Sequence, residues 1–198
     1  MLISHRYKFI CINIPKTGTA TREHAFKKYI DLTFKDKKFK INHYNPRHTK
    51  AASAKQEFLC NGWDWDNYFK FTFVRNPWHR YISFYNMWHS GGTVSESFES
   101  WLGNGFFGSD FQSSYYLEED KLILDKVYKY EDLEDSVKDI CNIVGIKENL
   151  LPLRNKKNAP KGGTQYDLLK YYTNQNLYEV VKRLEHDVID RMSYTLPE

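Results

Sequence analysis

Cysteine is scarce in this sequence, and long apolar runs are absent. The three cysteines, Cys11, Cys60 and Cys141, are odd in number and form no C-x-x-C pair, so the sequence indicates neither a disulfide scaffold nor a cysteine zinc site. We expect free thiols, buried at Cys11 and Cys141. No stretch approaches the roughly 20 apolar residues of a membrane span, and the N-terminal residues have no signal-peptide pattern.

The excess of positive over negative charge is also small, with a formal net charge of +4 over 198 residues. This balance favours anionic ligands without indicating a nucleic-acid partner, and a mildly basic surface with no role explains it equally well. Aromatic residues make up 17 % of the chain, far more than a disordered protein carries. The length suits one domain over residues 1–198, and we find no repeats or low-complexity linker.

A β-branched apolar run, a short polar loop and a helical pattern follow one another near the N-terminus. The run ends at Pro15, and the loop reads Lys-Thr-Gly-Thr-Ala-Thr over Lys16–Thr21. Such a loop directs backbone N–H groups and a helix N-terminus at one point, which is typical of a phosphate site. Lys16 adds a positive charge, and further hydroxyl donors are expected from Thr17, Thr19 and Thr21. The nucleotide-triphosphate motif differs, because its lysine follows the second glycine, whereas Lys16 precedes Gly18.

A second strand and helix carry another phosphate-type pattern. Phe69, Phe71 and Phe73 alternate with polar residues as in a strand, and Asn76-Pro77 then begins a helix. Arg75 therefore leaves the strand beside a helix N-terminus, and Ser83 follows about two turns later.

Both patterns resemble the sulfotransferases, enzymes that use 3′-phosphoadenosine 5′-phosphosulfate (PAPS) as sulfuryl donor. Pro-Lys-Thr-Gly-Thr resembles their 5′-phosphosulfate loop, and F-V-R-N-P-x-x-R-x-x-S-x-Y over Phe73–Tyr85 resembles their 3′-phosphate motif. Other segments, including one with a histidine ahead of the second strand, resemble more weakly the bacterial and Golgi-type carbohydrate sulfotransferases. The resemblance implies a bacterial or viral cytoplasmic enzyme, or a Golgi enzyme only if an anchor has been removed.

This resemblance implies a donor site and a mechanism. The PAPS-binding residues would be Lys16, Thr17, Gly18, Thr19, Ala20, Thr21, Arg75 and Ser83. Lys16 would stabilise the charge that grows on the bridging oxygen, and no metal is expected. His48 is the first choice for the base that takes the acceptor proton, with His43 and then Glu131 as alternatives. The non-catalytic alternative is that His48 is a surface or hydrogen-bonding histidine in a polar loop. The acceptor is expected to be a carbohydrate hydroxyl. The tryptophan rings either line a sugar-binding cleft or serve only in packing. The sequence does not indicate the oligomeric state.

The expected fold is α/β: a three-layer arrangement with a central parallel sheet between helices, as the sulfotransferases share with nucleotide kinases. Strands are expected over Tyr7–Ile14, Phe39–Ile41, Lys70–Val74 and Asp125–Tyr130. Helices are expected over Ala20–Tyr29, Ala51–Leu59, Trp78–Trp88, Ser97–Leu102 and Phe111–Leu117, then over Leu133–Val144 closed by Gly145, and over Leu177–Ile189 capped by Asn174. The loop Arg154–Thr164 is expected to cover the nucleotide.

Two other functions remain open from the sequence. A small kinase or NTPase would require ATP and magnesium, and the lysine spacing argues against it. A noncatalytic polyanion-binding module would explain basic loops but not two ordered phosphate patterns.

Overall fold

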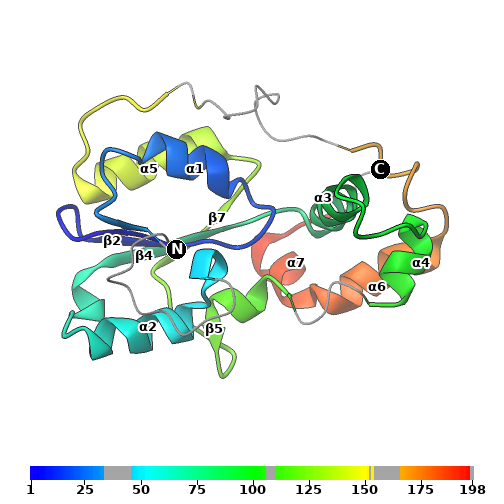
Figure 1. The fold of residues 1–198 in the computed structure, drawn as a ribbon, viewed down its shortest axis with the longest axis horizontal. Coiled ribbons are helices and arrows are strands. Elements are labelled where there is room, and N and C mark those ends of the chain that lie inside the picture. Colours follow the sequence, from blue (N-terminus) through cyan, green and yellow to red (C-terminus); the bar gives the residue numbers. More distant parts are fainter. Residues whose placement is uncertain (34–45, 106–109, 152, 154–165, 197–198) are drawn as a thin grey trace.

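A computed structural model describes residues 1–33, 46–105, 110–151, 153 and 166–196 of the chain (Figure 1). The expected strand Phe39–Ile41, the candidate base His43 and the expected covering loop Arg154–Thr164 lie outside the described residues.

A five-stranded mixed sheet lies at the centre of the fold. Its order is β3 (Leu32–Thr33), β1 (Leu2–Ser4), β2 (Phe9–Ile12), β4 (Phe69–Val74) and β7 (Lys126–Lys129). The strands β2, β4 and β7 run parallel, whereas β1 is antiparallel to both of its neighbours. The parallel part was predicted, but the hairpin of β1 and β2 was not, since the three residues of β1 are too few to show a strand period.

Alternation along the central strands separates two apolar cores. Phe9 and Cys11 face one side of β2 and contribute to one buried cluster, while Ile10 and Ile12 contribute to another on the opposite side. In β4, Phe71 extends the first of these clusters, as the predicted alternation of its phenylalanines requires.

Helices cover both faces, which confirms the three-layer α/β arrangement. The helices α1 (Thr19–Ala25) and α5 (Leu133–Val144) lie on one side of the sheet, and α2 (Ala51–Cys60) lies on the other (Figure 1). The predicted end of α5 is confirmed, because Gly145 follows it in the left-handed conformation, with φ 76°.

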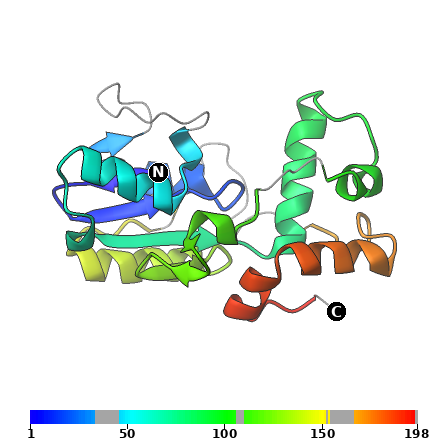
Figure 2. The same cartoon turned by 90° about the horizontal axis from the view of Figure 1, so that it is seen from below.

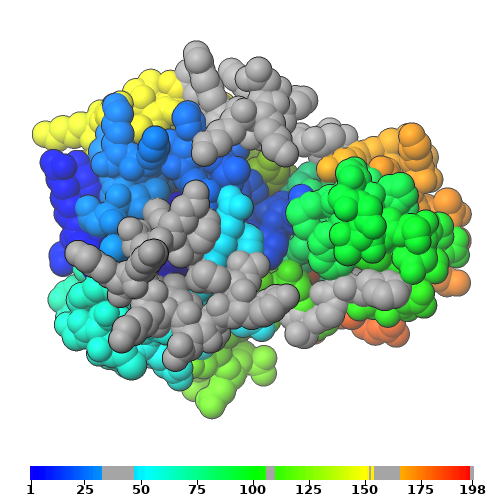
Figure 3. Space-filling model, viewed as in Figure 1, coloured from blue at the N-terminus to red at the C-terminus, as the bar shows by residue number. Residues whose placement is uncertain are grey.

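A helical part lies beyond the ends of the parallel strands (Figure 2). It contains α3 (Pro77–Ser90), α4 (Phe98–Gly103), α6 (Gln175–Leu184) and α7 (His186–Met192). It has its own apolar cluster, in which Trp78 and Trp101 are fully buried. In the space-filling view its green and orange surface adjoins the blue surface of the N-terminal elements (Figure 3). No helix of the described residues is long and apolar enough to cross a membrane.

The last predicted helix is two helices in the structure. Its cap is confirmed, because the Asn174 side chain accepts a hydrogen bond from the Leu177 N–H at 3.3 Å. The helix ends after Leu184, and Glu185 separates α6 from α7 with φ −117° and ψ 24°. The Glu185 side chain is buried at this break, whereas the apolar pattern of one continuous amphipathic helix predicts an exposed glutamate.

Short elements complete the chain. The segment Phe111–Leu117, expected to be helical, contains only the 3-10 turn η3 (Ser113–Tyr115) before the hairpin β5 (Leu117–Glu118) and β6 (Lys121–Leu122). Two further 3-10 turns are η1 (Pro46–His48) and η2 (Trp65–Asn67).

Candidate functional site

The loop between β2 and α1 has two residues in the left-handed backbone region. Lys16 has φ 68° and Gly18 has φ 81°. Glycine adopts this region without steric cost, whereas lysine does so only when its surroundings hold it there. A Cβ at position 18 would also overlap the ring of Tyr130. Gly18 is therefore required both by its backbone and by its neighbour.

Hydroxyl groups and a buried arginine shape this loop from within. Thr17 and Thr19 donate their hydroxyl hydrogens to the carbonyl of Ile14, at 2.8 and 3.4 Å. Arg22 donates to the Thr17 carbonyl and to both hydroxyls, and its guanidinium lies 4.5 Å from the ring centre of Phe73.

The two threonine hydroxyls thus have a role other than the ligand donation expected from the sequence. The Ile14 carbonyl requires a donor inside the loop, and they supply it. The predicted ligand contacts at these positions then depend on backbone N–H groups. Arg22 was missed by the sequence analysis; the only signal was a charged residue on a helix face that packs against the sheet.

The second motif meets the first at the carboxyl edge of the sheet. Arg75 leaves β4 and donates from Nη1 to the carbonyl of Lys16 at 3.3 Å. Its guanidinium lies over the rings of Tyr130 and Tyr166, 5.1 and 5.7 Å from their centres. The side chain of Gln112 accepts from the Arg75 N–H at 2.8 Å and donates to the Arg75 carbonyl at 2.9 Å. Burial lowers the pKa of Arg75. The contacts with the Lys16 carbonyl and the two tyrosine rings hold its guanidinium at the junction of the two loops.

The start of α3 is held by Glu131. One carboxylate oxygen of Glu131 accepts from the Asn76 N–H at 2.8 Å, and the other accepts from the Tyr194 hydroxyl at 2.7 Å. Glu131, the last choice for the base, therefore has structural partners on both oxygens. Ser83 lies further along α3, where it is buried.

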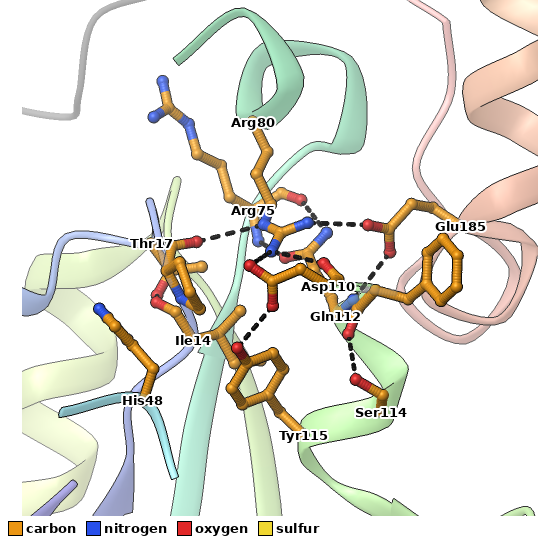
Figure 4. A network of polar contacts seen from close by, with 12 residues as sticks. Ile14, Thr17, His48, Arg75, Arg80, Asp110, Gln112, Ser114, Tyr115 and Glu185 are labelled. Atoms are coloured by element: carbon orange, nitrogen blue, oxygen red, sulfur yellow. Dashed lines mark hydrogen bonds and ion pairs between the residues drawn. The ribbon is translucent and has the colours of Figure 1, made fainter. Parts of the chain in front are cut away.

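His48 lies beside the beginning of the first loop (Figure 4). Its Nδ1 is 2.9 Å from the carbonyl oxygen of Asn13. Because a carbonyl only accepts, Nδ1 carries the hydrogen and Nε2 has the free lone pair. Burial lowers the pKa of His48 to about 4, so the ring is neutral at pH 7. The neutral imidazole leaves Nε2 unprotonated, as a general base requires, while the lowered pKa makes this nitrogen a weaker base than a free histidine.

A buried polar network connects the first loop to the helical part (Figure 4). Arg80 donates from Nε to the Pro15 carbonyl at 3.1 Å, from Nη1 to Glu185 at 2.9 Å, and from Nη2 to the Asp110 carbonyl at 2.9 Å. The second carboxylate oxygen of Glu185 accepts from the Gln112 N–H at 3.2 Å. Burial raises the pKa of Glu185 to about 7 against the opposing effect of Arg80. Glu185 and Gln112 had no signal in the sequence, since each depends on a partner far away along the chain.

The five tryptophans divide between two cores instead of lining one cleft. Trp63 and Trp65 pack with the cluster beneath α2, and the cluster of the helical part contains Trp78, Trp88 and Trp101. The packing interpretation is therefore the one that the structure favours.

Comparison with known proteins agrees with this geometry. A family model described as "Sulfotransferase family" matches residues 1–92, which include both loops. No curated protein matches the chain. Among solved structures, the fold is similar to that of mouse sulfotransferase SULT7A1 complexed with PAP, with a TM-score of 0.57 and 15 % identity over 96 % of this chain and 86 % of that one.

These findings support sulfuryl transfer and confirm the resemblance to PAPS-dependent sulfotransferases, though not to the carbohydrate subtype. The family model thus covers both phosphate-type loops, and the fold of the chain is similar to that of a sulfotransferase.

Proposed function

We propose that this protein transfers the sulfuryl group of PAPS to an acceptor hydroxyl, and that the acceptor is a carbohydrate. The observation that carries the proposal is the 3.3 Å hydrogen bond from Arg75 to the Lys16 carbonyl, which joins the two phosphate-type loops at one edge of the sheet. Both residues lie in the part of the chain that the family model matches.

The residues at this edge fit a donor with two anionic ends. In the proposal the backbone of Gly18–Thr21, including Ala20, and the charge of Lys16 hold the 5′-phosphosulfate. Arg75 and Ser83 hold the 3′-phosphate, for which the planar guanidinium suits a phosphate. The similarity to a PAP-bound structure supports this assignment, because PAP is what PAPS leaves after transfer.

His48 is the proposed base. The acceptor oxygen attacks the sulfur while the bond from sulfur to the bridging oxygen breaks, and the acceptor proton moves to Nε2 of His48. Lys16 stabilises the negative charge that develops on the bridging oxygen, as a preorganised donor does in phosphoryl transfer. Removing one such donor lowers the rate by about 10²–10³.

The carbohydrate acceptor is the finer part of the proposal. It depends on the likeness of the stretch around His48 to carbohydrate sulfotransferases. A screen of sugar, tyrosine-peptide and small alcohol acceptors with sulfur-labelled PAPS tests it, and labelling of a non-sugar acceptor alone would contradict it.

The donor site is tested by isothermal titration with adenosine 3′,5′-bisphosphate, in parallel with ATP with and without magnesium. We expect binding of adenosine 3′,5′-bisphosphate that needs no metal and is lost in Arg75→Ala. Arg6→Ala is the matched control, because Arg6 is an exposed arginine in the turn at the opposite end of β2. A preference for ATP with magnesium would favour a kinase, and equal weak binding of all anions would favour a polyanion-binding module.

A further inference from the structure

Lys16 has a backbone conformation that needs external support. For a residue with a Cβ, the left-handed region is unfavourable and is kept only where neighbouring contacts hold it. The carbonyls on both sides of Lys16 are held by arginines. The Pro15 carbonyl accepts from Arg80 at 3.1 Å, and the Lys16 carbonyl accepts from Arg75 at 3.3 Å.

Both arginines are in turn held through one carboxylate. Glu185 accepts from Arg80 on Oε1 at 2.9 Å and from the Gln112 N–H on Oε2 at 3.2 Å. The Gln112 side chain then bonds the backbone N–H and carbonyl of Arg75. Glu185, which Figure 4 shows beside Arg80 and Gln112, is thus the common anchor for the two contacts that flank Lys16.

This arrangement differs from an ordinary stabilising ion pair. Glu185 is 1 % exposed and Arg80 is fully buried, so the desolvation of both charges offsets most of their attraction. A buried pair of this kind contributes little net stability, but its geometry is well defined because every polar atom needs a partner. The pair lies between the α6–α7 junction and the first loop, so its fixed geometry also fixes the position of the Pro15 carbonyl.

We propose that Glu185 and Arg80 are positioning residues that hold Lys16 in its left-handed conformation from the helical part of the molecule. The inference deepens the proposed function, on which the role of Lys16 depends. The second arginine of the 3′-phosphate motif then supports the 5′ loop and does not contact the nucleotide. The C-terminal helices, which lie outside the residues that the family model matches, thereby take part in shaping the donor loop.

Glu185→Gln tests this in the full chain. The amide has nearly the same shape but offers one acceptor oxygen, while Arg80 and the Gln112 N–H both need one. We expect hydrogen exchange at the amides of residues 16–19, measured by mass spectrometry without ligand, to become faster by on the order of tenfold. Arg80→Lys, which keeps the charge but loses the fork that reaches three partners, is expected to show the same local change.

Val181→Ala is the matched control, because Val181 is fully buried in the same helical part and has no polar contact with the loop. It should lower the melting temperature without changing exchange at residues 16–19. Unchanged exchange there in both Glu185→Gln and Arg80→Lys, or an equal increase in Val181→Ala, would overturn the proposal.

Titration with adenosine 3′,5′-bisphosphate separates this inference from the proposed function. We expect about tenfold weaker binding in Glu185→Gln than in the wild type. Absence of binding in the wild type would remove the donor function, whereas the exchange measurement would still show whether Glu185 holds the loop.

Discussion

Single residues at the sheet edge show how strongly this site depends on contacts that are distant in the chain. His48 bonds the Asn13 carbonyl, 35 positions away, and Arg75 bonds the Lys16 carbonyl, 59 positions away. Each of these contacts sets a chemical property: the tautomer of the imidazole in one case and the place of the guanidinium in the other. Substituting one of these residues should therefore change binding or stability through the lost distant contact, and not only through the polarity of the side chain.

Gly18→Ala is expected to damage the donor loop severely. A Cβ is disfavoured at φ 81° by about 1–2 kcal/mol, and it would overlap Tyr130, so the loop or the tyrosine must move. We expect binding of adenosine 3′,5′-bisphosphate to weaken by at least on the order of tenfold, as measured by calorimetry. Gly62→Ala is the control, because Gly62 also has a positive φ but nothing lies within 4 Å of its added Cβ. Equal affinity in the two variants would contradict the explanation by overlap.

His48 should make stability depend on pH. Its pKa is lowered from 6.5 to about 4 in the folded protein, so the unfolded chain binds a proton first as the pH falls. The stabilisation is fully present above pH 6.5 and is lost as the pH falls towards 4. Between pH 7 and pH 4.5 we expect His48 to account for about 2 kcal/mol of the lost free energy of unfolding.

Urea denaturation at several pH values measures this effect. His48→Gln keeps a donor for Asn13 but does not titrate, so its free energy of unfolding should fall less over the same range. His89→Gln, at an exposed position on α3, is the control and should follow the wild type. Parallel curves for wild type and His48→Gln would show that His48 is not the cause.

At the scale of elements, helix ends decide how the helical part meets the loops. The cap at Asn174 and the left-handed Gly145 end their helices where the sequence predicts, because these signals lie within one turn. The division between α6 and α7 has no such signal. It occurs where Glu185 turns into the protein to meet Arg80, which is a long-range contact.

The Asn174 cap should be separable from its other contact. Its side chain accepts from the Leu177 N–H at 3.3 Å and also donates to Glu99 at 3.1 Å. Asn174→Ala should lower the free energy of unfolding by about 1 kcal/mol. Asn174→Ser keeps a capping oxygen and should recover most of that loss in urea denaturation. If serine is as destabilising as alanine, the contact with Glu99 is the more important one.

At the scale of the whole molecule, the sheet part and the helical part are joined through buried polar contacts. Arg80, Gln112 and Glu185 connect the two loops to the α6–α7 junction. Apolar packing joins them as well, because Val188 of α7 lies in the cluster of the sheet part and the next residue, Ile189, lies in that of the helical part. We therefore expect residues 1–198 to unfold as one domain.

The distribution of tryptophans makes this cooperativity measurable. Two tryptophans lie in the sheet part and three in the helical part, so fluorescence reports on both and circular dichroism on the helices. The two signals should give coincident urea transitions in the wild type. Glu185→Ala should separate them, and separate transitions in the wild type would contradict a single cooperative domain.

The local features of this protein could be predicted from its amino-acid sequence. These are the strands β2 and β4, the loops that follow them, the helix ends at Asn76, Asn174 and Gly145, and the resemblance of the two loops to those of sulfotransferases. Each depends on residues within one or two turns, where backbone preferences and apolar periodicity are readable.

The contacts that join these local features are visible only in the tertiary structure. It added the antiparallel β1, turned the threonine hydroxyls into the loop, gave His48 its tautomer, and placed Glu185 as a buried anchor. In each case the energy of a side chain or strand is set by partners far away in the chain, through burial and hydrogen bonding, and no local pattern records that.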